Sequence, residues 1–174
     1  LKASEIDGET VEAIVTDAIH VMGENTELAR FQVVEADAIA SYIHGGGKIG
    51  VLVQFGLEGI DPTAEAFKTC GHDVAMQVAA AAPVAANRES VDPAVIEHEM
   101  SIYKAQAAES GKPEAIQEKI ATGRMEKFYK ENCLVEQDFV KDPDQTISEY
   151  VDGVAKELGG TIKVEGFARF VMGE

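Results

Sequence analysis

The sequence predicts an α+β fold: two small lobes of antiparallel sheet packed with helices, plus a protruding antiparallel helical hairpin of coiled-coil type. Three observations support this fold class. Two apolar runs flank a glycine triplet at residues 45–47, as in a β-hairpin. Several other segments carry apolar residues at helical spacing, and a short Ser-Gly-Lys-Pro link joins two of them. With 174 residues, 45% of them hydrophobic, the chain can bury one core or two small ones.

The N-terminal lobe is expected to span residues 1–88. Apolar side chains at three- and four-residue steps predict an amphipathic helix over residues 11–22, which ends at Gly23. Residues 28–35 are expected to form a strand, and residues 39–55 the hairpin that follows it. Together these segments predict a three-stranded antiparallel meander covered by a helix.

The next helix is expected to start at Asp61-Pro62, with aspartate as the N-cap and proline in the first turn. Its apolar face runs on until Pro83 ends it. Asp92-Pro93 repeats the start signal. The helix that follows carries a narrow apolar seam at four-, three- and four-residue steps, formed by Ile96, Met100, Tyr103 and Ala107.

The C-terminal lobe is expected to span residues 89–174 and to include a helical hairpin at about residues 93–131. Ser110-Gly111-Lys112-Pro113 ends one helix and begins the next, so the two must fold back antiparallel. The second helix is expected to pack through Ile116, Ile120 and Phe128.

The end of the chain is expected to form a loop, a helix and a strand. Residues 137–144 predict a polar loop, and Thr146 with Glu149 predicts a capping box that opens a helix ending at residues 159–160. The last strand is expected to place four apolar side chains on one face, namely Ile162, Val164, Ala168 and Phe170.

The composition is strongly acidic, with 31 acidic against 15 basic residues and a formal net charge of −16. This charge disfavours binding to nucleic acid or to an anionic membrane surface. Cys70 and Cys133 lie far apart in the sequence, which favours a reducing compartment. The sequence shows no signal peptide and no apolar run long enough to cross a membrane. The start at Leu1, without methionine, indicates processing, trimming or excision from something longer.

A search for catalytic chemistry finds no convincing site. Gly45-Gly46-Gly47-Lys48 differs from a phosphate-binding loop, because isoleucine and a strand follow the lysine where that motif needs Ser or Thr and a helix. Cys70 and His72 are one close pair where zinc needs four ligands, and a buried core thiol is the favoured interpretation of Cys70. The sequence contains no GxSxG motif, and no spacing singles out a pair of carboxylates. We therefore expect no catalytic residue, no metal site and no cofactor.

Seven segments, in order along the chain, resemble bacterial and organellar elongation factor Ts. They are MGEN at residues 22–25, SYIHGGGKIGVLV at 41–53, DVAMQVAA at 73–80, SGKP at 110–113, GRMEKF at 123–128, LVEQDFVKD at 134–142 and FARFVMGE at 167–174. Gln77 within the third segment is similar to plastid members. The resemblance covers nearly the whole chain from about Val11.

The resemblance implies a guanine nucleotide exchange factor that binds the GTPase elongation factor Tu and promotes release of GDP without covalent chemistry. It also implies that the core or dimerisation-domain portion of such a factor is present. By motif position, the partner-binding residues would be Met22, Gly23, Glu24, Asn25, His44, Gly45, Gly46, Lys48, His72 and Asp73. Members of this family often carry a basic or histidine residue near the last two positions, so Asp73 is a departure from the pattern.

Two further departures leave alternatives open. The family's N-terminal helical domain and its TDFV-type loop, whose phenylalanine inserts near the magnesium site of the GTPase, do not occur in this sequence, and neither does its helix beyond Gly173. The alternative is a structural or ribosome-associated binding module built on the same core, without exchange activity. The helical hairpin can equally be a spacer or a surface for a partner or a second copy, and a homodimer is possible. Either a bacterial cytoplasm or an organelle interior (plastid stroma or mitochondrial matrix) fits the resemblance.

Overall fold

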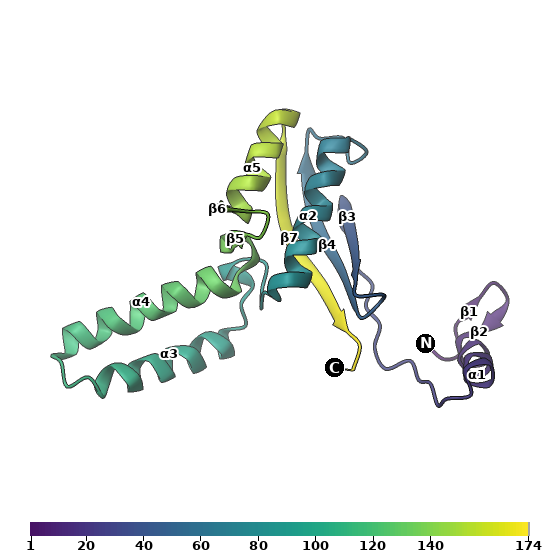
Figure 1. Ribbon diagram of the computed structural model, residues 1–174, viewed down its shortest axis with the longest axis horizontal. Coiled ribbons are helices and arrows are strands. Elements are labelled where there is room, and N and C mark those ends of the chain that lie inside the picture. The colour runs from purple at the N-terminus through teal and green to yellow at the C-terminus, as the bar shows by residue number, and fades with distance from the viewer. Residues whose placement is uncertain (174) are drawn as a thin grey trace. The chain divides into compact units, whose positions relative to one another are not determined.

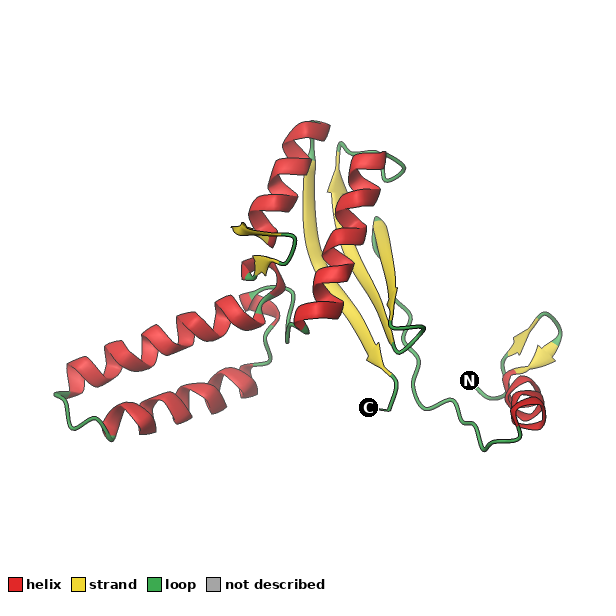
Figure 2. Cartoon of the chain, in the orientation of Figure 1, coloured by secondary structure: helices red, strands yellow, loops and turns green. Residues whose placement is uncertain are grey.

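The computed structural model describes residues 1–173 and confirms the α+β class (Figure 1). The colouring by secondary structure shows helices together with antiparallel strands (Figure 2). The chain separates into two compact units, residues 1–33 and residues 34–174.

The first unit consists of one helix preceded by a two-stranded hairpin. Strands β1 (Glu5–Ile6) and β2 (Glu9–Thr10) pair antiparallel, and α1 (Val11–Met22) follows at once. The Thr10 side chain caps the helix by accepting a hydrogen bond from Ala13 N. Gly23 ends it in the left-handed region, with φ of 70°. The helix predicted over residues 11–22 is therefore confirmed.

A three-stranded antiparallel sheet forms the centre of the second unit, in the order β3-β4-β7. Strand β3 (Ala38–His44) and strand β4 (Ile49–Glu58) form the hairpin expected around the glycine triplet. The third strand is β7 (Thr161–Val171), which pairs with the other side of β4.

The prediction of a strand at residues 28–35 is wrong, because these residues form no strand in the structure. Alternating apolar residues indicate that a segment can form a strand, but they do not determine which other strand it pairs with. The place next to β4 is taken by a strand more than a hundred residues further along the chain. The sheet thus draws strands from both sides of residue 88, where the boundary between two lobes was expected, and neither compact unit ends there.

The prediction that the four apolar side chains of the last strand share one face is wrong, because β7 contains a β-bulge. Ile162 and Val164 belong to the main core, but the register with β4 shifts between Gln54 and Phe55. The extra residue turns the strand over, so that the later side chains exchange faces. Ala168 pairs with Leu52 and lies outside the core cluster, while Phe167 packs against that cluster.

Two helices cover one face of this sheet, α2 (Glu65–Ala81) and α5 (Ile147–Leu158) (Figure 1). Their apolar sides and the sheet form the main core, whose fully buried members include Val53, Phe55, Cys70, Val74, Val78, Leu134 and Ile147. Asp61 does not cap α2 as predicted. Its carboxylate accepts hydrogen bonds from Thr63 instead, and the helix begins at Glu65.

The segment before α5 is more ordered than predicted. Part of the expected loop at residues 137–144 forms a short hairpin, β5 (Asp138–Phe139) and β6 (Asp142–Thr146), after the 3-10 turn η2 (Leu134–Glu136). The predicted capping box is confirmed, because the Thr146 hydroxyl and the Glu149 carboxylate each bond the other residue's backbone. The hydrogen bonds that the exposed Glu149 carboxylate accepts from the Thr146 backbone and hydroxyl lower the pKa of that carboxyl.

The helices α3 (Pro93–Ala108) and α4 (Glu114–Asn132) form the predicted antiparallel hairpin, here called the arm. Asp92 caps α3 as expected, by accepting a hydrogen bond from Ala94 N. The seam of α4 differs from the prediction, because Ile116 is 44% exposed and the buried positions are Ala121, Met125 and Phe128. No helix among residues 1–173 combines the length and the apolar character needed to cross a membrane.

At Gly71 the helix α2 lies close against the sheet. A Cβ atom added to Gly71 would lie 2.9 Å from Cβ of Ala40 on β3, closer than such atoms can pack. Neither atom is at the end of a flexible side chain, so the helix or the strand would have to move. Glycine at this position therefore sets the distance between α2 and β3.

We predict that Gly71→Ala lowers the free energy of unfolding by about 1 to 3 kcal/mol, because overpacking outweighs the better helix propensity of alanine. The matched control is Gly123→Ala in α4, where nothing lies within 4 Å of an added Cβ. That variant should be stabilised by up to about 1 kcal/mol. Urea unfolding measures both, and a shift of the same sign in the two variants would contradict the prediction.

Candidate protein-binding surface

The tip of the β3–β4 hairpin presents backbone and two basic side chains to solvent. His44 is the last residue of β3 and pairs with Ile49, so residues 45–48 form the turn. Gly45, Gly46 and Gly47 have φ of 62°, 68° and 95°, a region that other residues rarely adopt. The turn therefore needs glycine, and it leaves an exposed main chain between His44 and Lys48.

Tyr42 links two of the predicted partner-binding residues. Residues two apart on a strand share a face, so Tyr42 and His44 both lie on the side of β3 that α2 covers. The Tyr42 hydroxyl and His44 Nδ1 are hydrogen bonded at 3.1 Å, and the two rings stack. The ring of His72, at the exposed surface of α2, meets the Tyr42 ring edge-on with centroids 5.2 Å apart. The structure thus brings His44 and His72 together through one aromatic ring.

Two lysines accompany these histidines. Lys68 lies one helical turn before His72 on α2, and both border an open groove of about 380 Å³ beside β3. Lys48 adds a further cation at the hairpin tip. Lys68 also pairs with Glu65 at 2.8 Å, and this carboxylate offsets part of its charge. We call Tyr42, His44, residues 45–48, Lys68 and His72 the histidine surface.

Asp73 follows His72 in sequence but points the other way. Its side chain is only 7% exposed and accepts hydrogen bonds from Lys141 Nζ at 2.6 Å and from the Tyr150 hydroxyl at 3.0 Å. The carboxylate is therefore engaged inside the chain, although the family pattern places it among the partner-binding residues. Burial, and then the bond to Asp73, raises the pKa of Tyr150 above its ordinary value.

Gln77 continues this inward polar row one turn later on α2. Its amide nitrogen donates to Gln137 Oε1 and to the carbonyl of Asp138, both at 3.2 Å, and its amide oxygen accepts from Val140 N at 2.9 Å. The side chain is 1% exposed, so these bonds satisfy a fully buried amide. Asp73 and Gln77 together fasten the β5–β6 hairpin to the helix that carries His72.

The other predicted partner-binding residues belong to the first unit. Met22 is the last residue of α1 and is 55% exposed, and Gly23 ends the helix. Glu24 and Asn25 follow as exposed residues. The role of this corner in binding a partner stays a prediction of the family resemblance.

The two cysteines are buried core thiols, as expected from the periodicity of α2 for Cys70. Both are free and 0% exposed. Burial raises the pKa of Cys70 to about 12 and that of Cys133 to about 11, so both remain protonated at neutral pH. Within residues 1–173, no cluster of three or more potential ligands could hold a metal ion.

Sequence reasoning missed Tyr42, Lys141 and Tyr150 as members of this region. Tyr42 could have been found, because it shares a strand face with His44. Lys141 and Tyr150 could not, because they reach Asp73 from segments that are 68 and 77 residues away in sequence.

We predict that Asp73→Ala lowers the free energy of unfolding by about 2 to 3 kcal/mol, because it removes two hydrogen bonds and leaves the half-buried Tyr150 hydroxyl unpaired. The matched control is Asp142→Ala in β6, an exposed aspartate that accepts a hydrogen bond from the Gln145 side chain. Its effect should stay within about 0.5 kcal/mol. Equal midpoints for the two variants in urea unfolding would show that the Asp73 contacts do not hold the hairpin.

Comparison with known proteins places the chain in a family. The family model described as Elongation factor TS matches residues 1–174. The Elongation factor Ts of Trichlorobacter lovleyi is 49% identical over 168 residues, which cover 95% of this chain and 54% of that protein. That of Clostridium kluyveri is 46% identical over 170 residues, covering 97% and 55%. The chain spans about half the length of the curated relatives it matches, and it belongs to the elongation factor Ts family.

Proposed function

We propose that this chain binds elongation factor Tu and, as part of a longer protein, promotes the release of GDP from it. Membership in the elongation factor Ts family supports the role in translation elongation. The observation that carries the proposal is the histidine surface, where His44 and His72 lie exposed on either side of Tyr42 beside a glycine turn. His44 lies within one segment that resembles the family, and His72 directly precedes another.

The chemistry of the histidine surface suits recognition of another protein. Imidazole rings, a bare turn and lysine side chains can donate hydrogen bonds to a partner's carbonyl and carboxylate groups. The surface is rigidly supported, because β3 belongs to the sheet and α2 is fixed by the core and by its inward polar row. A rigid surface loses little conformational entropy when it binds.

In this proposal the protein acts without covalent chemistry. A protein that binds the GTPase more tightly when GDP is absent must, by linkage, weaken the binding of GDP to the same extent. The exchange factor therefore needs only contacts that differ between the two states of its partner. Met22, Gly23, Glu24 and Asn25 would add a second group of contacts from the first unit.

The cellular setting is part of the same proposal. We place the protein in a bacterial cytoplasm, because the relatives that it matches are from bacteria. An organelle interior stays an expectation of the resemblance. We propose neither a membrane nor a nucleic acid as a direct partner, since the net charge of −16 opposes both. Self-association into a homodimer stays a prediction of the resemblance.

We predict that His44→Ala and His72→Ala each weaken binding to elongation factor Tu about tenfold or more, a loss typical of a central interface residue. Isothermal titration of the chain into the GDP-free GTPase measures this. His98→Ala is the matched control, because His98 is an exposed histidine on α3 outside the histidine surface. Unchanged affinity in the first two variants, with unchanged circular dichroism, would exclude this surface as the binding site.

A second measurement separates exchange from binding alone. We expect the 174-residue chain to bind the GTPase but to release a fluorescent GDP analogue more slowly than the full-length Trichlorobacter lovleyi protein does, because the TDFV-type loop does not occur in these residues. Release as fast as with the full-length protein would show that the loop is dispensable. Binding with no release at all would favour the alternative, a binding module without exchange activity.

A further inference from the structure

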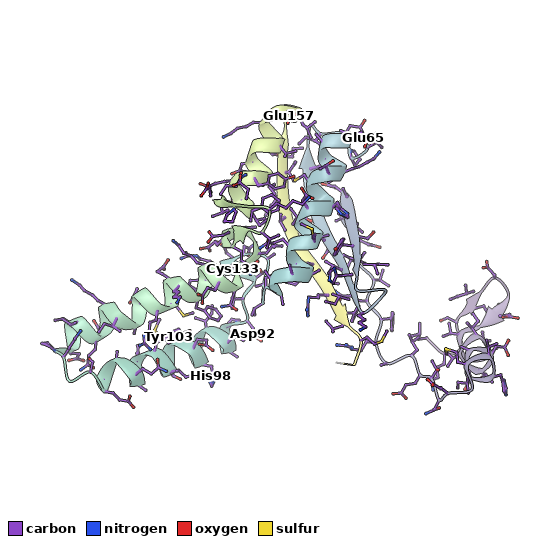
Figure 3. All side chains as sticks on the ribbon, in the orientation of Figure 1. Glu65, Asp92, His98, Tyr103, Cys133 and Glu157 are labelled. Atoms are coloured by element: carbon purple, nitrogen blue, oxygen red, sulfur yellow. The ribbon has the colours of Figure 1, made fainter. Side chains whose placement is uncertain are left out.

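The arm joins the rest of the second unit at one place, where its incoming and outgoing segments lie side by side. Ala85 and Cys133 form a parallel bridge, and Leu134 N donates to the carbonyl of Ala85 at 2.9 Å. Val135 N donates to the carbonyl of Ala86 at 3.1 Å. The labelled Asp92 and Cys133 mark this root of the arm (Figure 3).

Two separate apolar clusters meet at this root. Leu134 belongs to the main core between the sheet, α2 and α5. Cys133, the residue before it, belongs to a second cluster with Val91 and with Met125 and Phe128 of α4. Since no single core runs through both parts, the angle between the arm and the sheet depends on what crosses the joint.

Arg88 crosses it. Its side chain makes a two-pronged bond to Glu136 in η2, on the side of the main core, with Nε–Oε1 at 2.5 Å and Nη2–Oε2 at 2.7 Å. On the side of the arm, Nη1 donates to Glu126 Oε1 at 3.1 Å, and the guanidinium lies over the ring of Tyr129, 4.6 Å from its centre. Both Glu126 and Tyr129 belong to α4.

The position of Arg88 is itself fixed from its own side of the joint. It begins the 3-10 turn η1 (Arg88–Ser90), whose capping box joins Asn87 and Ser90 through both side chains. Arginine suits this place because its planar fork can meet one carboxylate with two nitrogens and still stack on an aromatic ring. Lysine would offer a single charge in place of the fork.

We propose that Arg88 is a positioning residue, which sets the direction of the arm relative to the sheet by holding Glu126 and Tyr129 of α4 against Glu136. A single exposed ion pair contributes little to stability, and the Arg88 side chain is 39% exposed. The geometry assigns a different role to this group, because its contacts lie on both sides of a joint between two cores. Removing it should change the angle of the arm more than it changes stability.

The test measures how widely the direction of the arm varies. Spin labels are placed on Lys112→Cys between the arm helices and on Glu157→Cys at the end of α5, both exposed positions. The native cysteines are fully buried and stay unlabelled in the folded chain. Double electron–electron resonance then gives the distribution of distances between the two labels.

We expect one narrow distribution for the parent chain and at least a doubling of its width for Arg88→Ala. The width for Arg88→Lys should lie between those of the parent and Arg88→Ala. The width for Glu126→Gln should also lie between them, because this variant weakens only the contact with α4. Lys127→Ala is the matched control, since it breaks the 3.5 Å pair of Lys127 with Glu131 inside α4 and crosses no joint. Its width should equal that of the parent.

An unchanged width in Arg88→Ala, even with a lowered melting temperature, would overturn the proposal and leave Arg88 with a role in stability alone. If Arg88→Ala loses its helical circular dichroism, Glu126→Gln decides in the same way, and a parental width in that variant overturns the proposal. The measurement needs no partner protein. Its outcome therefore stands apart from the proposed binding to elongation factor Tu.

Discussion

The pairing of β4 with β3 on one side and β7 on the other is the constraint on which the rest of the second unit depends. It joins residues 38–58 to residues 161–171, so the chain between them must leave the sheet and return. The sheet offers one face to α2 and α5, where Val53 and Phe55 are fully buried. The helix α2 packs on β3 and β4, while α5 packs on β7, so the three strands hold the two helices in one core. The arm leaves this core after α2 and returns to it before α5.

The helix α2 shows how one element serves both the core and the surface. Residues that follow each other on a helix point in directions about 100° apart, so His72 can be exposed while Asp73 is buried. Gly71 lets α2 approach Ala40 of β3 closely, and this approach brings the ring of His72 into contact with the ring of Tyr42. The inward row of Asp73 and Gln77 holds the β5–β6 hairpin against the same helix. The histidine surface is thus placed by packing that lies beneath it.

Local patterns predicted the elements well and their partners poorly. The glycine turn at residues 45–47, the end of α1 at Gly23 and the capping box at Thr146 follow from short-range rules, and the structure confirms each. The third strand of the sheet and the exchange of faces in β7 could not be predicted, because both depend on pairing between distant segments. The same limit applies to the surface: His44 and His72 could be named from motifs, but their link through Tyr42 needs the packing of α2 on β3.

The position of Arg88 bears on how the arm can be used. A stiff joint would present the arm and the histidine surface at a fixed spacing, so a partner that contacts both would lose little freedom of the chain when it binds. With a loose joint, each surface would bind the partner separately. The affinity gained from the second contact would then be limited by the effective concentration that a flexible link provides. The double contact of Arg88 with Glu136 and α4 favours the stiff arrangement, since side chains on both sides of the joint would have to separate before the arm could turn. The arm therefore needs a root that does not bend in either of its two possible uses, as a spacer that holds an angle or as a surface that binds a partner.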